Sequence, residues 1–435
     1  MAKILLHTLV FAPDGVSTAQ LMTELALELQ AQGHQVTVLT STPHYNVEPE
    51  ARARQPLTRR WGGLLYTSQL NGIRVYHASI PVKGARVGAR LLDYLRFHAI
   101  STLAGLVAVG RYDILLVPSP PLTIGLSAWL LGLLRRVPFI YNVQEIYPDV
   151  AVSLGVLQNR RVIDALERLE RFIYNRARAI TVISEWFRRR LLDKGTDDAK
   201  LSVIPNFVDT DFMQPGPKEN DFAQMHDLAN KFVVLYAGNI GLTQGFETIL
   251  DAARRLAHLP DLRFVIVGDG TRRAWLEAQL ASGEYANVQL LPYQPRSRVP
   301  QIYAAADLCL VPLKKGTAQE TFPSKIYTIM AAGRAVVAAA DPDSELAWVV
   351  KQAQCGWSIA PDDAPALAQT IAAAHAARVE LTQKGASGRG YVLRRHSRRA
   401  VTQQYDRLIR QLMRGADGDA AVSEAAAPEV KASGG

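Results

Sequence analysis

The sequence contains little cysteine and no apolar run long enough to cross a bilayer. Cys309 and Cys355 are its only thiols, which excludes a disulfide framework and leaves no cysteine cluster for a metal. The longest apolar run, 122–134, is shorter than the roughly 18–20 residues that span a membrane. The apolar start at 4–6 leads into a loop without a signal-peptide cleavage site. We therefore expect a protein of the reducing cytoplasm, with no disulfide, no metal and no transmembrane helix.

Acidic residues are also fewer than basic ones. The sequence has 40 Asp and Glu residues against 49 Lys and Arg residues, so its net charge is +9. A basic balance favours an anionic partner. The sequence has neither a zinc finger nor the aromatic strand of RNA-binding domains, so we expect no nucleic acid among its partners. A phosphate-bearing substrate and an anionic membrane remain, although each single arginine also fits a solvated helix face.

Short apolar runs alternate with helical patterns along the chain, as in βαβ units built on a mainly parallel sheet. Strand Lys3–Leu9 and helix Ser17–Gln32 open a first round, and strand Phe232–Ala237 opens a second. At 435 residues the chain exceeds the roughly 250–300 residues of a single core. The composition of its tail offers little apolar surface to bury, which predicts disorder. We expect an N-terminal domain over 1–205, a linker over 206–231, a C-terminal domain over 232–396, a helix over 397–414 that packs back on the N-terminal domain, and a disordered tail over 415–435.

Glycine-rich loops follow several of the predicted strands. Residues 237–245 carry three glycines at a strand-to-helix junction, where backbone N–H groups can face a phosphate. The loop matches neither the dinucleotide-binding fingerprint nor a P-loop. Gly268-Asp269-Gly270 follows the next strand, and Gly15 lies in the first loop of the first round. Each loop taken alone also fits an ordinary turn.

A lysine stands at the start of a predicted helix in the second round. Pro323-Ser324 is typical of a helix start, and Lys325 follows in the first turn. A cation there opposes the helix dipole at a cost of roughly a few tenths of a kcal/mol. This placement is favourable if an anion binds at the same end, and the alternative is a surface lysine whose charged end reaches water.

Polar side chains also follow a buried strand of the first round. Gln144, Glu145 and Asp149 come directly after the strand predicted at Phe139–Val143. Ligands of doubly wound folds bind at the carboxyl ends of the strands, so these side chains are candidates for binding a substrate. A loop closed by a Pro-Asp turn is the alternative interpretation.

Several segments follow one another in the order and spacing of a known family. Val203-Ile-Pro-Asn-Phe-Val-Asp209 is similar to the motif that opens its second domain, and the other segments are 166–185, 236–245, 267–270, 291–294 and 303–307. Together they resemble the retaining GT-B glycosyltransferases of sequence family four, in particular the subgroup of colanic-acid, capsule and O-antigen synthesis. The resemblance runs to about Met413. It implies an α/β fold of GT-B type, with two Rossmann-like doubly wound domains facing a central cleft.

The signature of that family is a pair of acids eight positions apart. Glu320 stands at the first position, where the resemblance implies a catalytic contact to hydroxyls of the transferred sugar. Thr328 stands at the second, where the family holds the ribose. Asn239 and Gln244 replace the Arg and Lys with which the family neutralises the diphosphate. We expect Lys325 and its helix start to supply the missing positive charge.

The resemblance assigns further residues to the two sides of the cleft, with Tyr293 as a candidate contact of the nucleobase. The donor-binding set is Gly238, Asn239, Gln244, Gly268, Asp269, Gly270, Tyr293, Ser324, Lys325 and Thr328. The acceptor-side set is Gly15, Gln144, Glu145, Asp149 and Ser184.

The function implied is that of a bacterial hexosyl- or N-acetylhexosaminyltransferase in exopolysaccharide or lipopolysaccharide synthesis. Its donor would be a nucleotide-sugar, UDP-linked rather than GDP-linked, and its acceptor a lipid-linked saccharide. The transfer would proceed with retention and without cofactor or metal; if it inverts, Glu145 or Asp149 is the base to test.

A peripheral position on the cytoplasmic face of the inner membrane also fits the sequence. The amphipathic stretch 87–109 and the arginines of the first half suit an anionic membrane surface, although the stretch also fits a buried helix. Two other functions stay open on the same fold, a nucleotide-sugar epimerase and a non-catalytic nucleotide-sugar-binding protein.

Overall fold

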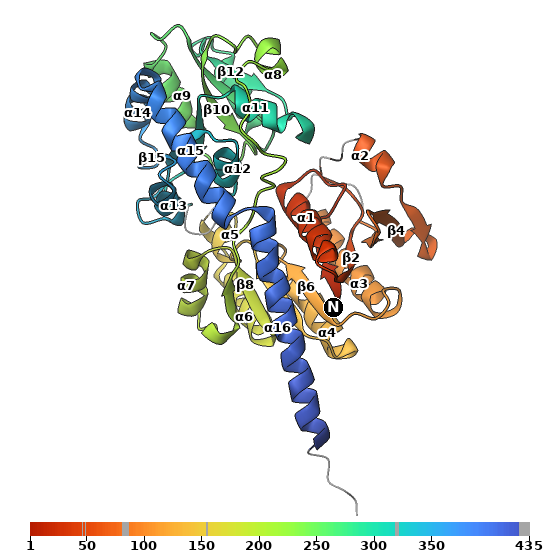
Figure 1. Cartoon of the computed structure of the whole chain (residues 1–435). Helices are drawn as coiled ribbons and strands as arrows, with labels where there is room; N and C mark the ends of the chain where they lie inside the picture. Colours follow the sequence, from red (N-terminus) through yellow and green to blue (C-terminus); the bar gives the residue numbers. More distant parts are fainter. Residues whose placement is uncertain (46, 48, 81–86, 154, 318–321, 426–435) are drawn as a thin grey trace, which may run out of the picture. The chain divides into compact units, whose positions relative to one another are not determined.

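The computed structural model describes residues 1–45, 47, 49–80, 87–153, 155–317 and 322–425, with the side chains of 87–92 and 415–425 left aside (Figure 1). Contacts along the backbone divide the chain into two units. The first comprises Met1–Asn142, Ile173–Thr181 and the chain from Thr402 onward, and the second comprises Val143–Phe172 and Val182–Val401.

A nine-stranded sheet in the order β3-β4-β5-β2-β1-β6-β7-β8-β9 organises the first half of the sequence. β1 pairs in parallel with β2 and β6, whereas β3, β4 and β5 form antiparallel pairs at one edge. β1 and β6 are buried along almost their whole length, as is typical of parallel strands covered on both faces. The strands are β1 (Lys3–His7), β2 (Gln35–Ser41), β3 (Thr58–Arg60), β4 (Leu65–Leu70), β5 (Ile73–Ala78), β6 (Ile114–Pro118), β7 (Phe139–Val143), β8 (Ala179–Val182) and β9 (Leu201–Val203).

The helices of this half follow the alternation that the sequence predicts. α3 and α4 pack closely, because a Cβ placed on Gly105 of α3 would lie 2.9 Å from a methyl carbon of Leu131 on α4. The helices are α1 (Ser17–Ala31), α2 (Pro49–Arg54), α3 (Val87–Val107), α4 (Ile124–Arg135), α5 (Asp149–Ser153), α6 (Arg160–Arg176) and α7 (Glu185–Asp193). Within the residues described, no helix combines the length and the apolar character that a membrane span needs.

The long helix α16 (Arg398–Ala425) returns to the first unit. Asp406 accepts a hydrogen bond from His34 at 2.7 Å, and Arg410 donates to Asp406 at 2.6 Å and to the carbonyl of Gln32 at 3.1 Å. These contacts hold α16 against the end of α1. The helix continues to Ala425, so the prediction of a disordered tail from 415 is wrong as far as that residue. Extending an existing helix through alanine and glutamate needs no new nucleation, and 426–435 lie outside the described residues.

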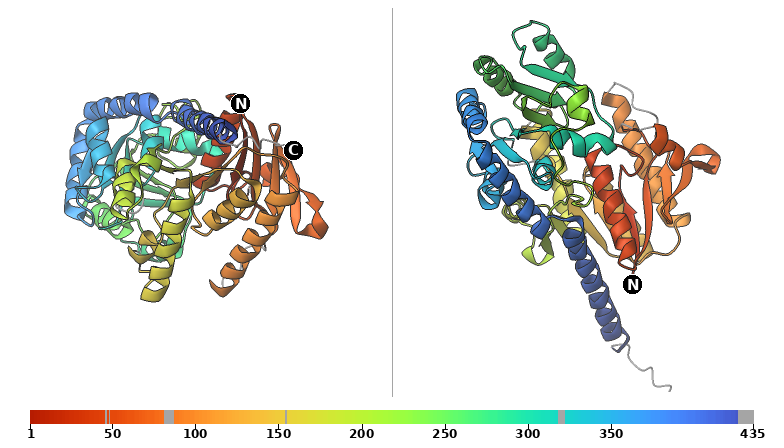
Figure 2. Two further views of the ribbon diagram at one scale, coloured as in Figure 1. Left: turned by 90° about the horizontal axis from the view of Figure 1, so that it is seen from below. Right: turned by 45° about the horizontal axis from the view of Figure 1, so that its top comes forward.

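The second unit is built on a six-stranded sheet whose neighbouring strands all pair in parallel. Alternate residues of β10 enter two different cores, Val233 and Leu235 on one face and Phe232 and Val234 on the other. Helices therefore cover both faces of the sheet (Figure 2). In sheet order, the strands are β12 (Val288–Leu291), β11 (Leu262–Val267), β10 (Phe232–Ala237), β13 (Leu308–Pro312), β14 (Ala335–Ala339) and β15 (Gly356–Ile359).

The sheet of the second unit ends in the short strand β15, which pairs with β14. One sequence-based expectation about this unit is wrong. The segment 206–231 is not a free linker, since Met213, Phe222 and Leu228 are buried in the second core. The helices of the unit beyond α7 are α8 (Asp221–Met225), α9 (Phe246–Arg255), α10 (Arg273–Leu280), α11 (Val299–Ala305), α12 (Lys325–Ala331), α13 (Glu345–Ala353), α14 (Ala364–Ala376) and α15 (Arg378–Arg395).

Candidate functional site

Two glycine loops interlock at the carboxyl ends of β10 and β11. The strands pair in register, with Ala237 opposite Val267, so the loop 238–245 emerges beside the loop 268–270. Gly268 has φ +153°, and a Cβ placed there would lie 1.9 Å from the carbonyl oxygen of Gly238. No side chain fits at that distance. The structure thus brings together two loops that the sequence identified separately, and it explains their glycines by close backbone approach.

Three N–H groups in the first loop are already used by backbone carbonyls of the domain. Gly238 donates to the carbonyl of Val267 at 2.9 Å, Ile240 donates to Asp269 at 2.8 Å, and Gly245 donates to Pro312 at 2.9 Å. Their N–H groups therefore do not face a ligand, which corrects the expectation that the whole loop cradles phosphate with its backbone.

The two amides of this loop shape it. The side-chain oxygen of Gln244 accepts the N–H of Gly241 at 3.0 Å, and its nitrogen donates to Thr243 at 2.7 Å. The carbonyl of Asn239 accepts the hydroxyl of Tyr236. Gln244 thus has a structural contact in the place where the family resemblance expects a diphosphate-binding cation.

The ammonium of Lys325 lies directly beside this loop. Lys325 is the first residue of α12, and its Nζ stands 3.8 Å from the ring centroid of Tyr236. A Cβ placed on Gly238 would lie 2.8 Å from the same Nζ. Among the described residues this Nζ is buried and forms no hydrogen bond. The sequence predicted the helix start and a cation near an anion site, and the structure adds that the cation points at the glycine loop.

Burial has a large effect on the charge of this lysine. Removal from water lowers the pKa of Lys325 from its ordinary 10.5 to about 7, because a cation without a counter-charge is poorly stabilised away from solvent. The contact with the Tyr236 ring offsets only part of that cost. An anion delivered to this position would restore the charged form.

The first turn of α12 offers an anion fewer free backbone N–H groups than we expected from the sequence. The N–H groups of Ile326 and Tyr327 donate to Pro323 at 3.1 Å and to Ser324 at 3.0 Å. Ser324 is the N-cap residue, although its side chain makes no capping bond. The positive charge at this end of the helix therefore comes chiefly from Lys325.

Other cations near the loops were not identified from the sequence. Arg272 donates its backbone N–H to the carbonyl of Ile240 at 2.9 Å, and its guanidinium lies 2.6 Å from Glu247 on α9. Lys314 reaches the same carboxylate at 3.4 Å. The pKa of Glu247 is lowered. Partial burial alone would raise this pKa, but hydrogen bonds from the backbone of Glu247 itself and from Arg272, together with the nearby charge of Lys314, outweigh that effect. The Arg-Arg pair just after Gly270 was the only sequence signal for this group.

The remaining donor-side candidates occupy separate places. Thr328 stands one turn after Lys325 on α12 and is half-buried. Asp269 is exposed and accepts the N–H of Gly270 at 2.8 Å. Tyr293 is exposed in the loop that follows β12. Glu320, the catalytic candidate, lies outside the described residues.

The acceptor-side candidates differ in what holds them. Gly15 donates its N–H to the carbonyl of Tyr45 at 2.8 Å, beside Asp14, whose carboxylate accepts the N–H groups of His44 and Tyr45 at 2.7 Å each. The loop after β1 is therefore fastened to the loop after β2. Ser184 caps α7 by accepting the N–H of Phe187 at 3.2 Å.

The polar group after β7 divides into one buried carboxyl and one ion-paired carboxylate. Burial raises the pKa of Glu145, as a proton-accepting role would require. Asp149 instead lies 2.8 Å from Arg190 and 2.6 Å from Lys194. Gln144 accepts a hydrogen bond from Asn206 at 2.9 Å. Of these residues, Asp149 has the contacts of a structural ion pair, and Glu145 stays the candidate base.

The two halves of the chain match two known domain families. The Glycosyl transferase 4-like domain matches residues 18–206, and the domain of Glycosyl transferases group 1 matches residues 217–384. Both halves are glycosyltransferase domains, so the chain is a glycosyltransferase. Its two Rossmann-like α/β domains are those of the GT-B architecture, as the sequence predicted.

The chain is similar to other glycosyltransferases, one of which is named for colanic acid biosynthesis. The glycosyltransferase is 27% identical over 352 residues to WcaI of Escherichia coli, described as a colanic acid biosynthesis glycosyl transferase, with 79% of this chain and 84% of WcaI covered. It is 26% identical to the glycosyltransferase WbjE of Pseudomonas aeruginosa, with 70% and 76% covered. The structure of HepE from Anabaena, solved with UDP and glucose, has the same fold with a TM-score of 0.72 at 17% identity, covering 94% of this chain and all of that one.

Proposed function

We propose that this glycosyltransferase moves a hexosyl or N-acetylhexosaminyl group from a UDP-sugar to a lipid-linked saccharide in the synthesis of a bacterial surface polysaccharide. The observation that carries the proposal is the buried ammonium of Lys325 beside Gly238. A cation that no described residue neutralises, next to a glycine loop at the carboxyl ends of parallel strands, fits the diphosphate of such a donor. The name of WcaI supports the polysaccharide, and the UDP bound by HepE supports the nucleotide.

The chemistry explains why a cation is needed at that position. Breaking the bond between the sugar and the diphosphate places negative charge on the departing phosphate, and a preorganised cation stabilises that charge as it forms. In our proposal Lys325 takes this role in place of the cations missing at Asn239 and Gln244. Glu320 contacts the sugar hydroxyls, Thr328 lies toward the ribose and Tyr293 toward the base.

We further propose that the transfer retains the anomeric configuration and that the departing phosphate accepts the proton of the acceptor. No cofactor or metal takes part in the proposed reaction. If analysis of the product anomer shows inversion, Glu145 is the base to test, because burial raises its pKa and Asp149 is engaged by Arg190 and Lys194.

The first experiment measures binding and turnover separately. Purified protein is titrated with UDP, GDP and dTDP by calorimetry, and the matching sugar donors are supplied with a membrane lipid extract. We expect UDP to bind and a labelled lipid product to form. Lys325→Ala should weaken UDP binding, whereas Lys384→Ala, which removes another lysine that lies over an aromatic ring, should not.

Each alternative function predicts a different result in the same experiment. Conversion of the donor to its epimer without any acceptor would show an epimerase. UDP binding without any turnover would leave a nucleotide-sugar-binding protein. Equal UDP affinity in Lys325→Ala and wild-type protein would refute the assignment of the diphosphate to Lys325.

The acceptor also determines where the enzyme works. We propose that the protein acts at the cytoplasmic face of the inner membrane as a peripheral protein, because a lipid-linked saccharide remains in the bilayer. The arginines of the first half and the amphipathic helix α3 support this location. Separation of cell membranes from cytosol, followed by immunodetection, tests it.

A further inference from the structure

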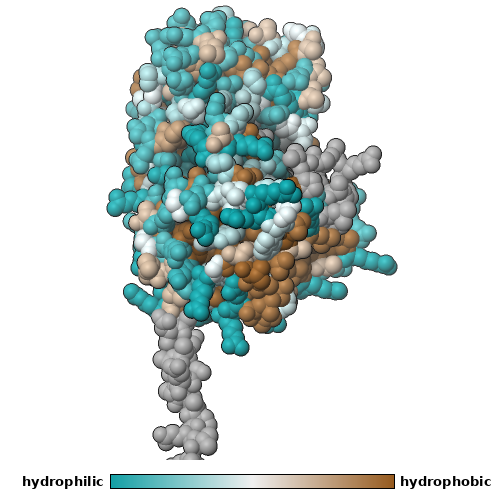
Figure 3. Space-filling view, turned by 90° about the vertical axis from the view of Figure 1, so that its right-hand side faces the viewer, coloured by the Kyte–Doolittle hydropathy of each residue, from teal (hydrophilic) through white to brown (hydrophobic). Residues whose placement is uncertain are grey.

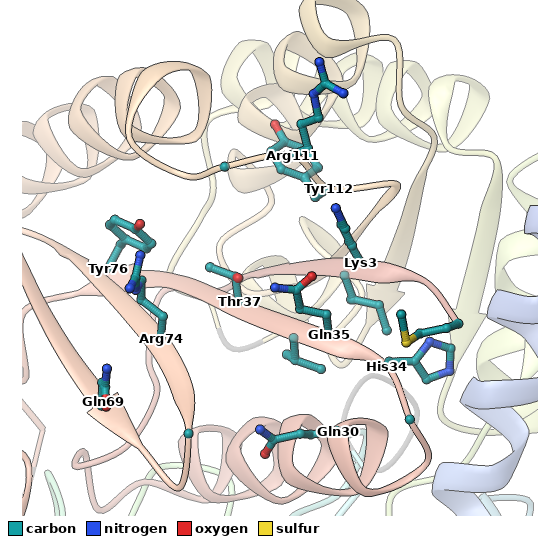
Figure 4. Close-up of a pocket in the computed structure, with 16 residues that line it drawn as sticks. Lys3, Gln30, His34, Gln35, Thr37, Gln69, Arg74, Tyr76, Arg111 and Tyr112 are labelled. Carbon is teal, nitrogen blue, oxygen red and sulfur yellow. The ribbon is translucent and has the colours of Figure 1, made fainter.

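A basic pocket opens at the amino-terminal edge of the first sheet, away from the loops after β1 and β7. It has a volume of about 610 Å³ and is lined from β1, β2, β4, β5 and the segment that joins α3 to β6. Figure 4 shows Lys3 and Tyr112 on one side of the open space and Arg74 and Tyr76 on the other. The lining includes three exposed cations, Lys3, Arg74 and Arg111, and no carboxylate.

The three cations are not neutralised by their surroundings. Among the described residues none of them forms a salt bridge, and Asp113 nearby accepts only the backbone N–H of Lys3 at 2.7 Å. Amide side chains of Gln35 and Gln69 add uncharged hydrogen-bond donors. The pocket therefore offers charge and hydrogen bonds to an anion such as a phosphate.

An exposed apolar face lies next to this pocket. On α3, Leu95, Leu103 and Val107 are 58%, 52% and 67% exposed. On α4, Leu133 and Leu134 are 60% and 55% exposed. Figure 3 shows hydrophobic side chains gathered on the side of the molecule where Figure 1 places these two helices. We call this surface, formed by Leu95, Leu103, Val107, Leu126, Leu130, Leu133 and Leu134, the α3–α4 face.

The chain connects the α3–α4 face to the pocket. Helices of a parallel α/β sheet run opposite to the strands, so the carboxyl ends of α3 and α4 return to the edge where β1 begins. Arg135, at the end of α4, donates to the carbonyl oxygens of Gly105 at 3.3 Å and Val109 at 3.1 Å. Its guanidinium also lies 5.6 Å from the ring centroid of Tyr112, which lines the pocket. The apolar surface and the cations thus form one continuous region.

We propose that this region docks on an anionic phospholipid bilayer, with the α3–α4 face in the interfacial layer and a lipid phosphate in the pocket of Lys3, Arg74 and Arg111. Charge complementarity favours a bilayer over a second protein, because a protein partner would have to bring carboxylates to three unpaired cations and apolar cover to two helices. The proposal rests on the membrane association included in the proposed function.

The test compares vesicle binding by three variants of the full chain. Co-sedimentation is measured with phosphatidylcholine vesicles and with vesicles that also contain phosphatidylglycerol. The pocket variant is Lys3→Ala/Arg74→Ala/Arg111→Ala, and the face variant is Leu103→Ser/Leu133→Ser/Leu134→Ser. The control, Arg160→Ala/Arg254→Ala/Arg378→Ala, removes the same charge from exposed arginines elsewhere.

We expect wild type and control to bind the anionic vesicles. Each cation near such a surface contributes roughly fivefold to partitioning, so the pocket variant should bind on the order of 100-fold more weakly. The face variant should also lose binding to the anionic vesicles, and titration with inorganic phosphate should show no saturable binding. Equal binding of the pocket variant and the control, or saturable phosphate binding in the absence of vesicles, would overturn the proposal.

Two further readouts separate this proposal from the transferase proposal. A UDP-induced thermal shift shows that each variant is folded with an intact donor site, and turnover is measured on acceptor dissolved in detergent. We expect both to be retained, while turnover on acceptor in anionic vesicles falls in the pocket and face variants. If wild type forms a dimer and the face variant does not, the α3–α4 face binds a second copy of the chain. That result would overturn the proposal of bilayer docking. Failure of transfer by wild type, with vesicle binding intact, would refute only the transferase proposal.

Discussion

Replacing Lys325 with methionine should make the protein more stable and a poorer donor binder at the same time. The side chains have similar lengths, and the buried position suits an apolar group better than an ammonium that forms no hydrogen bond with any described residue. Folding lowers the pKa of Lys325 from 10.5 to about 7. At about 1.4 kcal/mol for each pH unit between these values, the charged group costs on the order of 4 kcal/mol at neutral pH. A residue that destabilises the fold in this way is kept in a protein when the residue is needed for function.

The pH dependence of this difference has a definite sign. Between pH 7 and 10.5 the unfolded chain holds the proton of Lys325 and the folded chain has lost it, so wild-type stability rises with pH in this window. The stability advantage of Lys325→Met should therefore shrink by about 2 kcal/mol from pH 7 to pH 9. Urea unfolding at several pH values measures it, with Lys384→Met as the same substitution at another lysine.

Donor binding should change in the opposite direction. A charge-assisted hydrogen bond contributes roughly 1.5–3 kcal/mol, so Lys325→Met should bind UDP about 10- to 100-fold more weakly. Because the free enzyme holds Lys325 half charged near pH 7, UDP binding by wild type should take up protons, which calorimetry in buffers of different ionisation enthalpy detects. A destabilised Lys325→Met variant, or one with wild-type UDP affinity, would refute the reasoning.

Three further predictions concern other parts of the structure. Gly268→Ala should abolish UDP binding and lower the melting temperature, because its Cβ would collide with the carbonyl of Gly238; an unchanged thermal-shift response to UDP would contradict the interlocked loops. Burial raises the pKa of Glu345 to about 7, against a hydrogen bond from Ser184, so the folded state binds the extra proton and wild-type stability should fall as pH rises from 4.5 to 7. Glu345→Gln should then raise the melting temperature at pH 8 but not at pH 4.5, and equal effects at both values would count against it. Asp149→Asn should destabilise the fold by roughly 1–3 kcal/mol through the loss of the Lys194 pair while folded enzyme keeps its kcat, whereas a catalytic base would lose kcat without loss of stability.

The periodicity of the sequence determined most of the architecture. Apolar runs such as Phe232–Ala237 alternate with helical patterns, and strands buried on both faces leave this signature wherever the helices pack. Elements without a strong pattern were missed, such as β15, which is four residues long and only partly buried. The segment 206–231 looked like a linker because prolines and acids hide the few apolar residues, Phe222 among them, that anchor it.

The site was predicted in its parts but not in its electrostatics. The sequence identified the glycine loops and Lys325, because glycines after strands and a lysine at a helix start can be recognised from local sequence, although each also fits an ordinary turn or a surface lysine. Only the tertiary structure showed that the loops interlock, that three N–H groups of the first loop are used by backbone carbonyls, and that Arg272 and Lys314 share Glu247. Hydrogen-bond pairing, burial and pKa depend on contacts between residues that are far apart in the sequence. The local sequence does not show which of these residues come into contact.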